Sequence, residues 1–272
     1  MIDYILEIFC DASQEEAVQS RLFLSSSTGS VFAHGVLAAY FDSPGDRDAA
    51  ASLLRPLGVG LNEVDQERVD WLEVYQQSLE PLVIGERFLV APDPSLIPRD
   101  AERLTIVVPQ EQAFGTGSHE TTSLCIEILE TLDVRGLRGL DVGAGSGILA
   151  IAMHRLGAAR AIAFDNDPDA YGALRDNRIR NHVPDAAMPL FIGSVEALRG
   201  GAFDVVTMNI IPEVIVPLLG EVVSHLARDA RLLLSGILVV KREDVVAAAA
   251  THGLRLHEER AKGEWWAGVF GR

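Results

Sequence analysis

Residues 140–147, Leu-Asp-Val-Gly-Ala-Gly-Ser-Gly, constrain the fold of this chain more than any other segment. An apolar residue and an acid lead into three glycines at alternate positions, and the apolar run 148–153 that follows is typical of a buried helix face. A strand that turns at once into a helix through bare glycine backbone lets a bulky ligand lie against the chain. The helix N-terminus favours ligand groups that are negative or accept hydrogen bonds. The segment therefore predicts a ligand-binding turn in an α/β domain.

Strand-like and helix-like segments alternate from residue 121 onward. The expected strands are 140–142, 161–164, 188–192, 204–208 and 231–235, and the expected helices are 121–132, 148–156, 168–181, 215–226 and 243–252. Such alternation is typical of a parallel sheet covered on both faces, as in Rossmann-like domains. The last two strand-like segments, 254–259 and 265–270, have no helix between them. We therefore expect a mostly parallel seven-stranded sheet with an antiparallel hairpin at one edge.

The first 66 residues follow a different pattern. Strand-like and helix-like segments succeed one another in the order β-α-β-β-α-β, which is typical of a small ferredoxin-like α+β domain. Residues 67–80 indicate a connecting helix that Pro81 ends. We therefore predict a ferredoxin-like domain at 1–66, a linker helix and connecting segment at 67–100, and the larger domain at 101–272.

Composition excludes several classes of protein. No apolar run approaches the roughly 20 residues that span a bilayer, and residues 1–4 lack the basic region of a signal peptide. We therefore expect a cytoplasmic protein that does not associate with membranes. The two cysteines, Cys10 and Cys125, and the seven histidines show no metal-ligand spacing. Reduced, partly buried thiols and no metal site are the expectation.

Acidic residues dominate the charge, which is −16 overall. A nucleic-acid-binding protein would need a basic surface, so no direct nucleic-acid partner is expected. Residues 1–70 hold twelve acidic residues against four arginines, a net charge of −8. This excess has two interpretations, ordinary solubilising charge or a docking surface for a basic partner. Charge alone favours the first.

The spacing of the glycines distinguishes between nucleotide ligands. Gly143, Gly145 and Gly147 alternate, whereas the dinucleotide fingerprint is Gly-x-Gly-x-x-Gly. Asp141 would repel a pyrophosphate, but it is able to pair with an ammonium group or accept hydrogen bonds from amides. Both features favour S-adenosylmethionine, which has a cationic amino-acid tail and no phosphate. A purely structural role for Asp141, as a cap of the turn, stays open.

Asp165 follows the second expected strand, 22 residues after Gly143. An acid at about this distance is placed to accept hydrogen bonds from both ribose hydroxyls. NAD and S-adenosylmethionine share this feature, so Asp165 indicates an adenosyl ligand without choosing between the two.

Several further segments are distinctive: Ala-Phe-Gly-Thr-Gly-Ser-His-Glu-Thr-Thr at 113–122, Asp-Asn-Asp-Pro at 165–168, Asn-Ile-Ile at 209–211, Leu-Ser-Gly-Ile-Leu at 234–238 and Glu-Trp at 264–265. With the glycine turn, they make the chain resemble class I S-adenosylmethionine-dependent methyltransferases. It resembles more specifically the PrmA-type methyltransferases, whose substrate is the large-subunit ribosomal protein L11. The resemblance covers 70–272 well and the N-terminal domain in outline.

The resemblance implies transfer of methyl groups to lysine side-chain amines of a basic ribosomal protein, with the N-terminal amine as a further candidate. Asn209 would orient the amine and is the expected catalytic residue. His119 would assist proton loss or serve only as a structural residue of its loop. Together with Asp141, the expected cofactor contacts are Gly115, Thr116, Thr122, Gly143, Gly145, Gly147, Asp165 and Asn209.

Three other functions stay open. The chain would also suit a methyltransferase for another protein or a small amine. A ribosome assembly factor that binds the cofactor without turnover is a second alternative. An NAD-dependent oxidoreductase is the third, although the glycine spacing and Asp141 oppose it. Under the leading hypothesis, the acidic N-terminal domain recognises the basic target protein.

Overall fold

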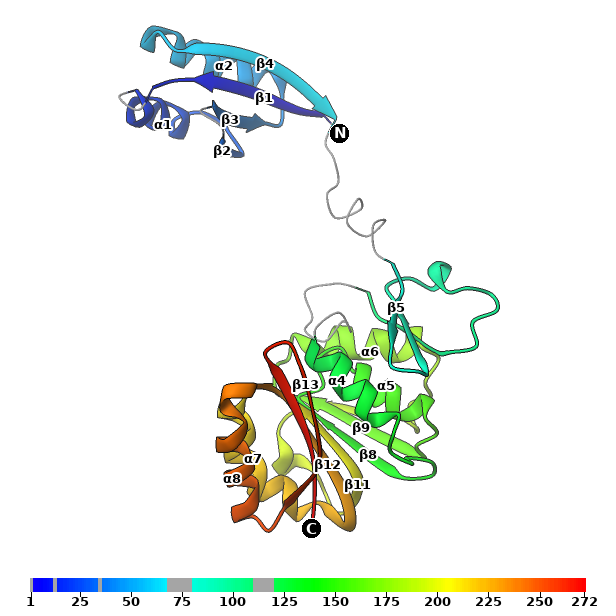
Figure 1. Cartoon of the computed structure of the whole chain (residues 1–272). Coiled ribbons are helices and arrows are strands. Elements are labelled where there is room, and N and C mark those ends of the chain that lie inside the picture. Colours follow the sequence, from blue (N-terminus) through cyan, green and yellow to red (C-terminus); the bar gives the residue numbers. More distant parts are fainter. Residues whose placement is uncertain (1, 12–13, 34–35, 68–79, 110–119) are drawn as a thin grey trace. The chain divides into compact units, whose positions relative to one another are not determined.

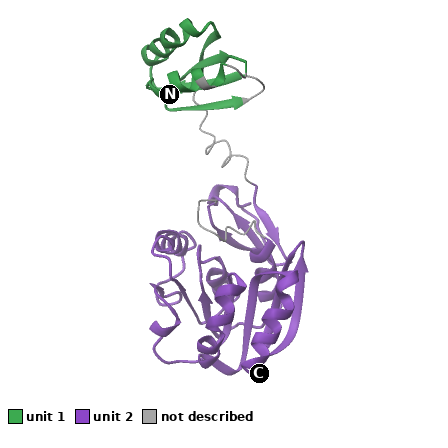
Figure 2. Cartoon of the chain, turned by 90° about the vertical axis from the view of Figure 1, so that its left-hand side faces the viewer, with its two compact units in different colours: residues 1–77 green, residues 78–272 purple. Residues whose placement is uncertain are grey.

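A computed structural model describes residues 2–11, 14–33, 36–67, 80–109 and 120–272 (Figure 1). The chain divides into two compact units, Met1–Gln77 and Ser78–Arg272 (Figure 2), which we describe separately. The expected linker helix over 67–80 lies almost wholly outside the described residues. Residues 80–100, which the sequence analysis assigned to the linker, belong to the second unit. The predicted domain limits stay a prediction.

The first unit is a four-stranded antiparallel sheet with two helices. The strands lie in the order β2-β3-β1-β4. Their bounds are β1 (Ile2–Phe9), β2 (Gly29–Ala33), β3 (Val36–Phe41) and β4 (Gly60–Glu67), with helices α1 (Glu15–Phe23), α2 (Pro44–Leu54) and a 3-10 turn η1 (Arg55–Leu57). Helix α2 begins where Ser43 Oγ accepts the N–H of Asp46 at 3.1 Å, a side-chain cap. The element order is the expected β-α-β-β-α-β, and the ferredoxin-like class stays a prediction.

The second unit is built on a seven-stranded sheet in the order β10-β9-β8-β11-β12-β14-β13. Its strands are β8 (Arg138–Val142), β9 (Arg160–Asp165), β10 (Leu190–Ile192), β11 (Phe203–Asn209), β12 (Leu226–Leu238), β13 (Arg255–Lys262) and β14 (Trp265–Gly271). The first five are parallel, while β14 runs antiparallel to both β12 and β13. The predicted mostly parallel sheet with an antiparallel edge hairpin is therefore confirmed.

Helices cover both faces of this sheet (Figure 1). Helices α4 (Glu120–Leu129), α5 (Ile148–Arg155) and α6 (Ala170–Arg180) contribute to one buried cluster, and α7 (Pro212–Ser224) and α8 (Arg242–Thr251) to the other. Adjacent residues of β11 face different clusters: Val205 joins the first and Val206 the second. This alternation is what a sheet buried on both faces requires.

A small sheet packs against the α4–α5 side. Its strands are β5 (Leu82–Ile84), β6 (Phe88–Ala91) and β7 (Leu104–Val107), with a 3-10 turn η2 (Pro94–Leu96) between β6 and β7. Ile84, Phe88 and Ile106 are buried in the same cluster as α4 and α5. The burial of these three side chains holds the small sheet against the α4–α5 side of the second unit.

Two further expectations concern the thiols and the membrane. Cys10 is half-buried and Cys125 is buried, and both are free thiols. Burial raises the pKa of the Cys125 thiol to about 12, so it is protonated and unreactive at neutral pH. No helix in the described part of the chain is long and apolar enough to cross a membrane.

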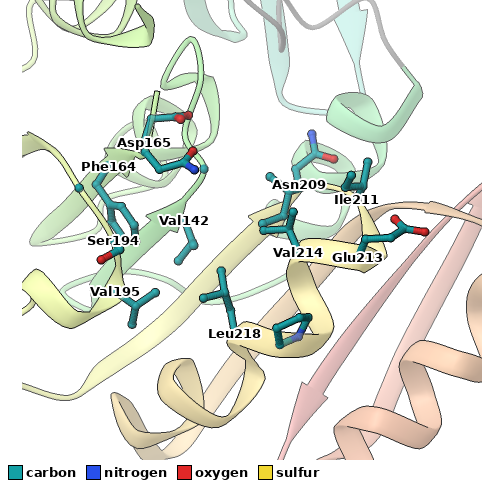
Figure 3. Close-up of a pocket in the computed structure, with 15 residues that line it drawn as sticks. Val142, Phe164, Asp165, Ser194, Val195, Asn209, Ile211, Glu213, Val214 and Leu218 are labelled. Carbon is teal, nitrogen blue, oxygen red and sulfur yellow. The ribbon is translucent and has the colours of Figure 1, made fainter. Parts of the chain in front are cut away.

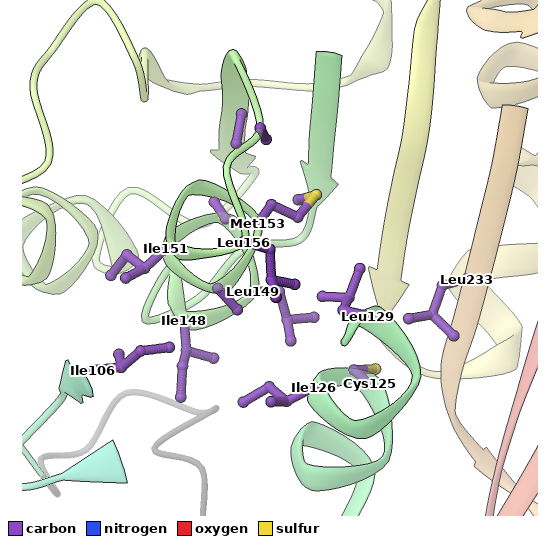
Figure 4. Close-up of a cluster of buried hydrophobic side chains, with 14 of the residues drawn as sticks. Ile106, Cys125, Ile126, Leu129, Ile148, Leu149, Ile151, Met153, Leu156 and Leu233 are labelled. Atoms are coloured by element: carbon purple, nitrogen blue, oxygen red, sulfur yellow. The ribbon is translucent and has the colours of Figure 1, made fainter. Parts of the chain in front are cut away.

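The buried cluster between α4, α5 and the sheet stabilises the second unit (Figure 4). Ile151 on α5 is fully buried there, whereas Ile179 on α6 is 58% exposed. We expect Ile151→Ala to lower the free energy of unfolding by about 2–5 kcal/mol, because it removes buried methyl groups and leaves a cavity. The matched change Ile179→Ala should alter it by less than about 0.5 kcal/mol. Urea denaturation measures both, and equal effects would contradict this account of the core.

Candidate cofactor and substrate site

A cavity of about 640 Å³ opens at the carboxyl edge of the central sheet (Figure 3). The ends of β8, β9 and β11 and the first turns of α7 line it. The chain order turns back at this point, because β9 and β10 lie on one side of β8 and β11 and β12 on the other. Open α/β sheets bind their ligands at such a switch point. The cavity is therefore the candidate site.

The glycine turn forms one wall of the site. Gly143 lines the cavity, and φ is 68° at Gly143, 51° at Gly145 and 78° at Gly147. A Cβ atom at Gly143 would lie 2.6 Å from Ile210 Cγ2, and one at Gly147 would lie 2.5 Å from Leu174 Cδ1. Only glycine meets both requirements without strain, a left-handed backbone and no side chain. Gly145 and Gly147 shape the turn but are not among the residues that line the cavity.

Asp165 is the last residue of β9 and lines the cavity. Its Oδ2 accepts the N–H of Gly145 at 2.9 Å, and its Oδ1 accepts the N–H of Asp167 at 3.0 Å. A carboxylate has about four acceptor positions, so both oxygens retain capacity for a ligand. Asp165 therefore fixes the glycine turn and still presents acceptors that suit a pair of ribose hydroxyls.

Asp141 is buried and is not among the residues that line the cavity. Its Oδ1 accepts the hydroxyl of Thr207 at 2.7 Å, and its Oδ2 accepts the N–H of Ala150 in the first turn of α5 at 3.2 Å. Burial raises the pKa of Asp141 to about 6, although these two hydrogen bonds oppose the rise. The carboxylate thus caps α5 and joins β8 to β11, which is the structural role left open by the sequence. Its contact with a cofactor stays a prediction.

Asn209 ends β11 and lines the cavity on a different side from Asp165 (Figure 3). Its Nδ2 donates to Thr122 Oγ1 at 3.4 Å, and Thr122 lies fully buried in the first turn of α4. Its Oδ1 is buried and accepts no hydrogen bond from the described residues. Buried carbonyl oxygens nearly always accept a hydrogen bond, so this one is suited to a donor that enters with the ligand. Thr122 orients the amide and does not itself line the cavity.

The remaining wall is apolar. Phe164, Val195, Val214 and Leu218 line it, and Phe164 stacks on Phe191 with ring centroids 4.8 Å apart. A flat aromatic base would find a matching surface there. Among the described lining residues Asp165 and Glu213 are acidic, and none is lysine or arginine. A pyrophosphate would therefore meet no lysine or arginine among the described lining residues, whereas a cationic adenosyl compound would meet the two carboxylates.

The structure leaves part of the expected site undescribed and adds residues that the sequence analysis missed. Gly115, Thr116 and His119 lie outside the described residues. The missed residues are Ser194 and Val195, which follow β10, and those of the first turns of α7. A signal for them existed, because segments that follow neighbouring parallel strands meet at one edge of the sheet.

Comparisons with known proteins agree on one family. The family model described as "Ribosomal protein L11 methyltransferase (PrmA)" matches residues 10–272. A relative named ribosomal protein L11 methyltransferase, from Pelobacter propionicus, is 35% identical over 239 residues, which are 86% of this chain and 75% of the relative. Another of the same name, from Ectopseudomonas mendocina, is 34% identical over 258 residues, 91% and 86% of the two chains.

A solved structure supports the same assignment. The crystal structure of a ribosomal protein L11 methylase from Lactobacillus delbrueckii subsp. bulgaricus superposes with a TM-score of 0.66 at 28% identity, covering 71% of this chain and 99% of that one. The fold is thus the class I methyltransferase fold expected from the glycine turn. The chain belongs to the PrmA family of ribosomal protein L11 methyltransferases, and it is an S-adenosyl-L-methionine-dependent methyltransferase.

Proposed function

We propose that this protein methylates lysine side-chain amines, and the N-terminal amine, of ribosomal protein L11. The family match and the relatives' names support this target. The observation that carries the chemistry is the buried Oδ1 of Asn209 at the edge of the cavity, which accepts no hydrogen bond from any residue that the structure describes. We place the activity in the cytoplasm, as the sequence predicts. We expect no direct contact to nucleic acid, because none of the described lining residues is lysine or arginine and the chain carries a charge of −16.

Different residues of the cavity would contact different parts of the cofactor. Asp165 would accept the ribose hydroxyls, and the apolar wall around Phe164 and Leu218 would face the adenine. Gly143 lines the cavity, and its backbone would face the remainder of the cofactor. When bound, S-adenosylmethionine supplies a methyl group that its sulfonium already activates. The protein therefore contributes mainly position and the exclusion of water.

The target amine must be neutral to react. A lysine amine with its ordinary pKa near 10.4 is only roughly 0.1% neutral at physiological pH. The apolar side chains of Ile210 and Val214 line the site beside Asn209, and transfer into such surroundings lowers the pKa of an amine. Asn209 Oδ1 would accept an amine N–H and so direct the nitrogen lone pair. An uncharged acceptor suits this task because it does not stabilise the ammonium form as a carboxylate would.

The acidic first unit supports a role in recognising the target. Residues 1–70 carry a net charge of −8, and ribosomal proteins are mostly basic. Asp11 and Asp42 are among the acidic residues exposed there. We therefore assign Asp11 and Asp42, as exposed acidic side chains of this unit, a part in attracting the target.

The function as a whole is tested by incubating the purified protein with S-adenosylmethionine and ribosomal protein L11, followed by mass spectrometry. Methylated lysines or a methylated N-terminus are expected. Labelled cofactor in a cell extract separates the alternatives. Label on another protein or on a small amine, with none on L11, would show that the substrate is that molecule and not L11. Cofactor binding without any methylated product would instead identify an assembly factor that lacks turnover.

The first site prediction concerns Asp165. Asp165→Ala should weaken binding of S-adenosylhomocysteine, the demethylated cofactor, by about 10- to 100-fold, because hydrogen bonds to a charged group contribute roughly 1.5–3 kcal/mol. Asp167→Ala is the matched control, since the Asp167 carboxylate accepts the N–H of Asp169 at 2.9 Å and does not line the cavity. Isothermal titration calorimetry measures both. Unchanged affinity in Asp165→Ala would show that Asp165 does not bind the cofactor.

The second site prediction concerns Asn209. Asn209→Ala should lower kcat by about 100-fold, because a misplaced nucleophile of this kind costs about that much. Its effect on cofactor affinity should be smaller. Asn62→Ala makes the same chemical change in the first unit, where Asn62 donates to Glu7. A radiolabel transfer assay at saturating substrates gives kcat, and equal kcat values for the two variants would rule out the proposed role.

The third prediction concerns recognition of the target protein. Asp11→Asn with Asp42→Asn should lower kcat/KM for L11 by about two- to tenfold, since exposed ion pairs contribute roughly 0.2–1 kcal/mol each. The difference should shrink as salt is added, because salt screens exposed charges. Glu221→Gln with Asp229→Asn removes two exposed charges from the second unit as a control. If both pairs of changes act alike, the first unit has no special attraction for the target.

A further inference from the structure

The segment Leu234–Leu238, Leu-Ser-Gly-Ile-Leu, has no role in the proposed function so far. It ends β12, and Ser235 lies directly opposite Asn209 in the parallel pairing of β12 with β11. On the other side, the pairing of β12 with β14 shifts register between Leu234 and Ile237. Ser235 and Gly236 therefore lie in an irregular part of the strand beside Asn209. Irregularities of this kind are common next to active sites, where they redirect side chains.

Gly236 approaches the chain next to Asn209 very closely. Its φ is +81°, and a Cβ atom there would lie 2.6 Å from the carbonyl oxygen of Ile210 and 2.9 Å from both its C and N atoms. These are backbone atoms, so they do not swing aside as the end of a flexible side chain does. The bare backbone of Gly236 thus packs against the Ile210 peptide, and any side chain at 236 would displace it.

The glycine turn confines Ile210 from another direction. A Cβ atom at Gly143 would lie 2.6 Å from Ile210 Cγ2, so the Ile210 side chain fills the space that a side chain at 143 would need. Ile210 is therefore packed between a glycine that follows β8 and a glycine of β12. Because Ile210 follows Asn209 directly, these two contacts set where Asn209 lies relative to the cofactor turn.

Ser235 connects the same segment to the support of the Asn209 side chain. The fully buried Ser235 hydroxyl donates to the Thr121 carbonyl oxygen at 3.3 Å. Thr122, the next residue of α4, accepts the Asn209 Nδ2 at 3.4 Å. One segment of β12 thus contacts both the peptide that follows Asn209 and the helical turn that holds its amide.

We propose that Gly236 is a positioning residue for methyl transfer: by packing against the Ile210 peptide, it fixes the Asn209 acceptor relative to the cofactor turn. The inference rests on the proposed role of Asn209. A side chain at 236 would shift the Asn209–Ile210 peptide away from β12, and a displacement of about 1 Å is enough to slow a positioned reaction by about 100-fold.

The competing explanation is that position 236 needs glycine only for its left-handed backbone. Gly253 provides the matched control, because its φ is +76° and nothing lies within 4 Å of where its Cβ would be. Alanine at either position meets the same backbone strain, and only alanine at 236 meets the Ile210 peptide. Comparison of the two variants therefore isolates the contact.

The experiment compares Gly236→Ala with Gly253→Ala at saturating cofactor and target. We expect kcat to fall at least about tenfold in Gly236→Ala and to stay within about threefold of the native value in Gly253→Ala, with similar cofactor Kd for the two variants and with both folded at the assay temperature. In an Asn209→Ala background, Gly236→Ala should add little further loss, because both changes act through the same group. Equal kcat values for the two glycine variants, or fully additive losses, would overturn the proposal.

A second measurement needs neither turnover nor a stable Gly236 variant. The side-chain amide signal of Asn209 in a ¹⁵N NMR spectrum is the one that disappears in Asn209→Ala. Ser235→Ala should shift this signal, whereas Ser224→Ala, which removes a hydroxyl that donates to Glu221 at the end of α7, should not. An unmoved signal in Ser235→Ala would refute the positioning role. Failure of the native protein to methylate L11 would refute the proposed function alone, because the amide signal reports position independently.

Discussion

The contact between β8 and β11 is the constraint on which the site depends. The two strands pair from Val205 opposite Gly139 to Met208 opposite Val142, and at their centre Thr207 donates to the buried Asp141 carboxylate. That carboxylate also caps α5, so a single side chain fixes the first turn of the helix against the middle of the sheet. The glycine turn and Asn209 lie at the ends of these two strands. The distance between the glycine turn and Asn209 is therefore set by the pairing of β8 with β11, and buried residues pack against both faces of these strands.

Much of the fold was predictable from the sequence because its signals are local. The glycines before the apolar run 148–153 identify a strand, a turn and a helix, and the alternation after residue 121 identifies the parallel sheet. The same local pattern placed Asp165 at a strand end, where the structure has it. By contrast, residues 80–100 join the second unit because Ile84 and Phe88 are buried against α4 and α5. No local pattern reports that packing.

Asp141 shows why residue type and spacing alone do not decide a role. An acid just before the first glycine suits an ammonium group and suits equally a helix that needs a cap. The structure shows the capping role: both oxygens accept hydrogen bonds from the protein, and Asp141 is not among the described residues that line the cavity. Contact of Asp141 with the cofactor stays a prediction. The pKa of about 6 follows from the same burial. Asn209 differs, because only the structure shows that its buried Oδ1 accepts no hydrogen bond within the described part of the chain.

The charges of the site explain why the proposed acceptor is an amide. Cofactor and target amine both arrive as cations, and an acidic protein attracts both. The same attraction opposes the reaction, because a carboxylate beside the amine would hold it as an unreactive ammonium. Of the two described acids in the lining, Asp165 avoids this conflict by its position. Asp165 lies on a different side of the cavity from Asn209, and Glu213 is exposed on the first turn of α7. Under the proposed function, the acidic residues would attract the two cations, and the neutral Asn209 would accept the amine where the pKa of that amine must fall.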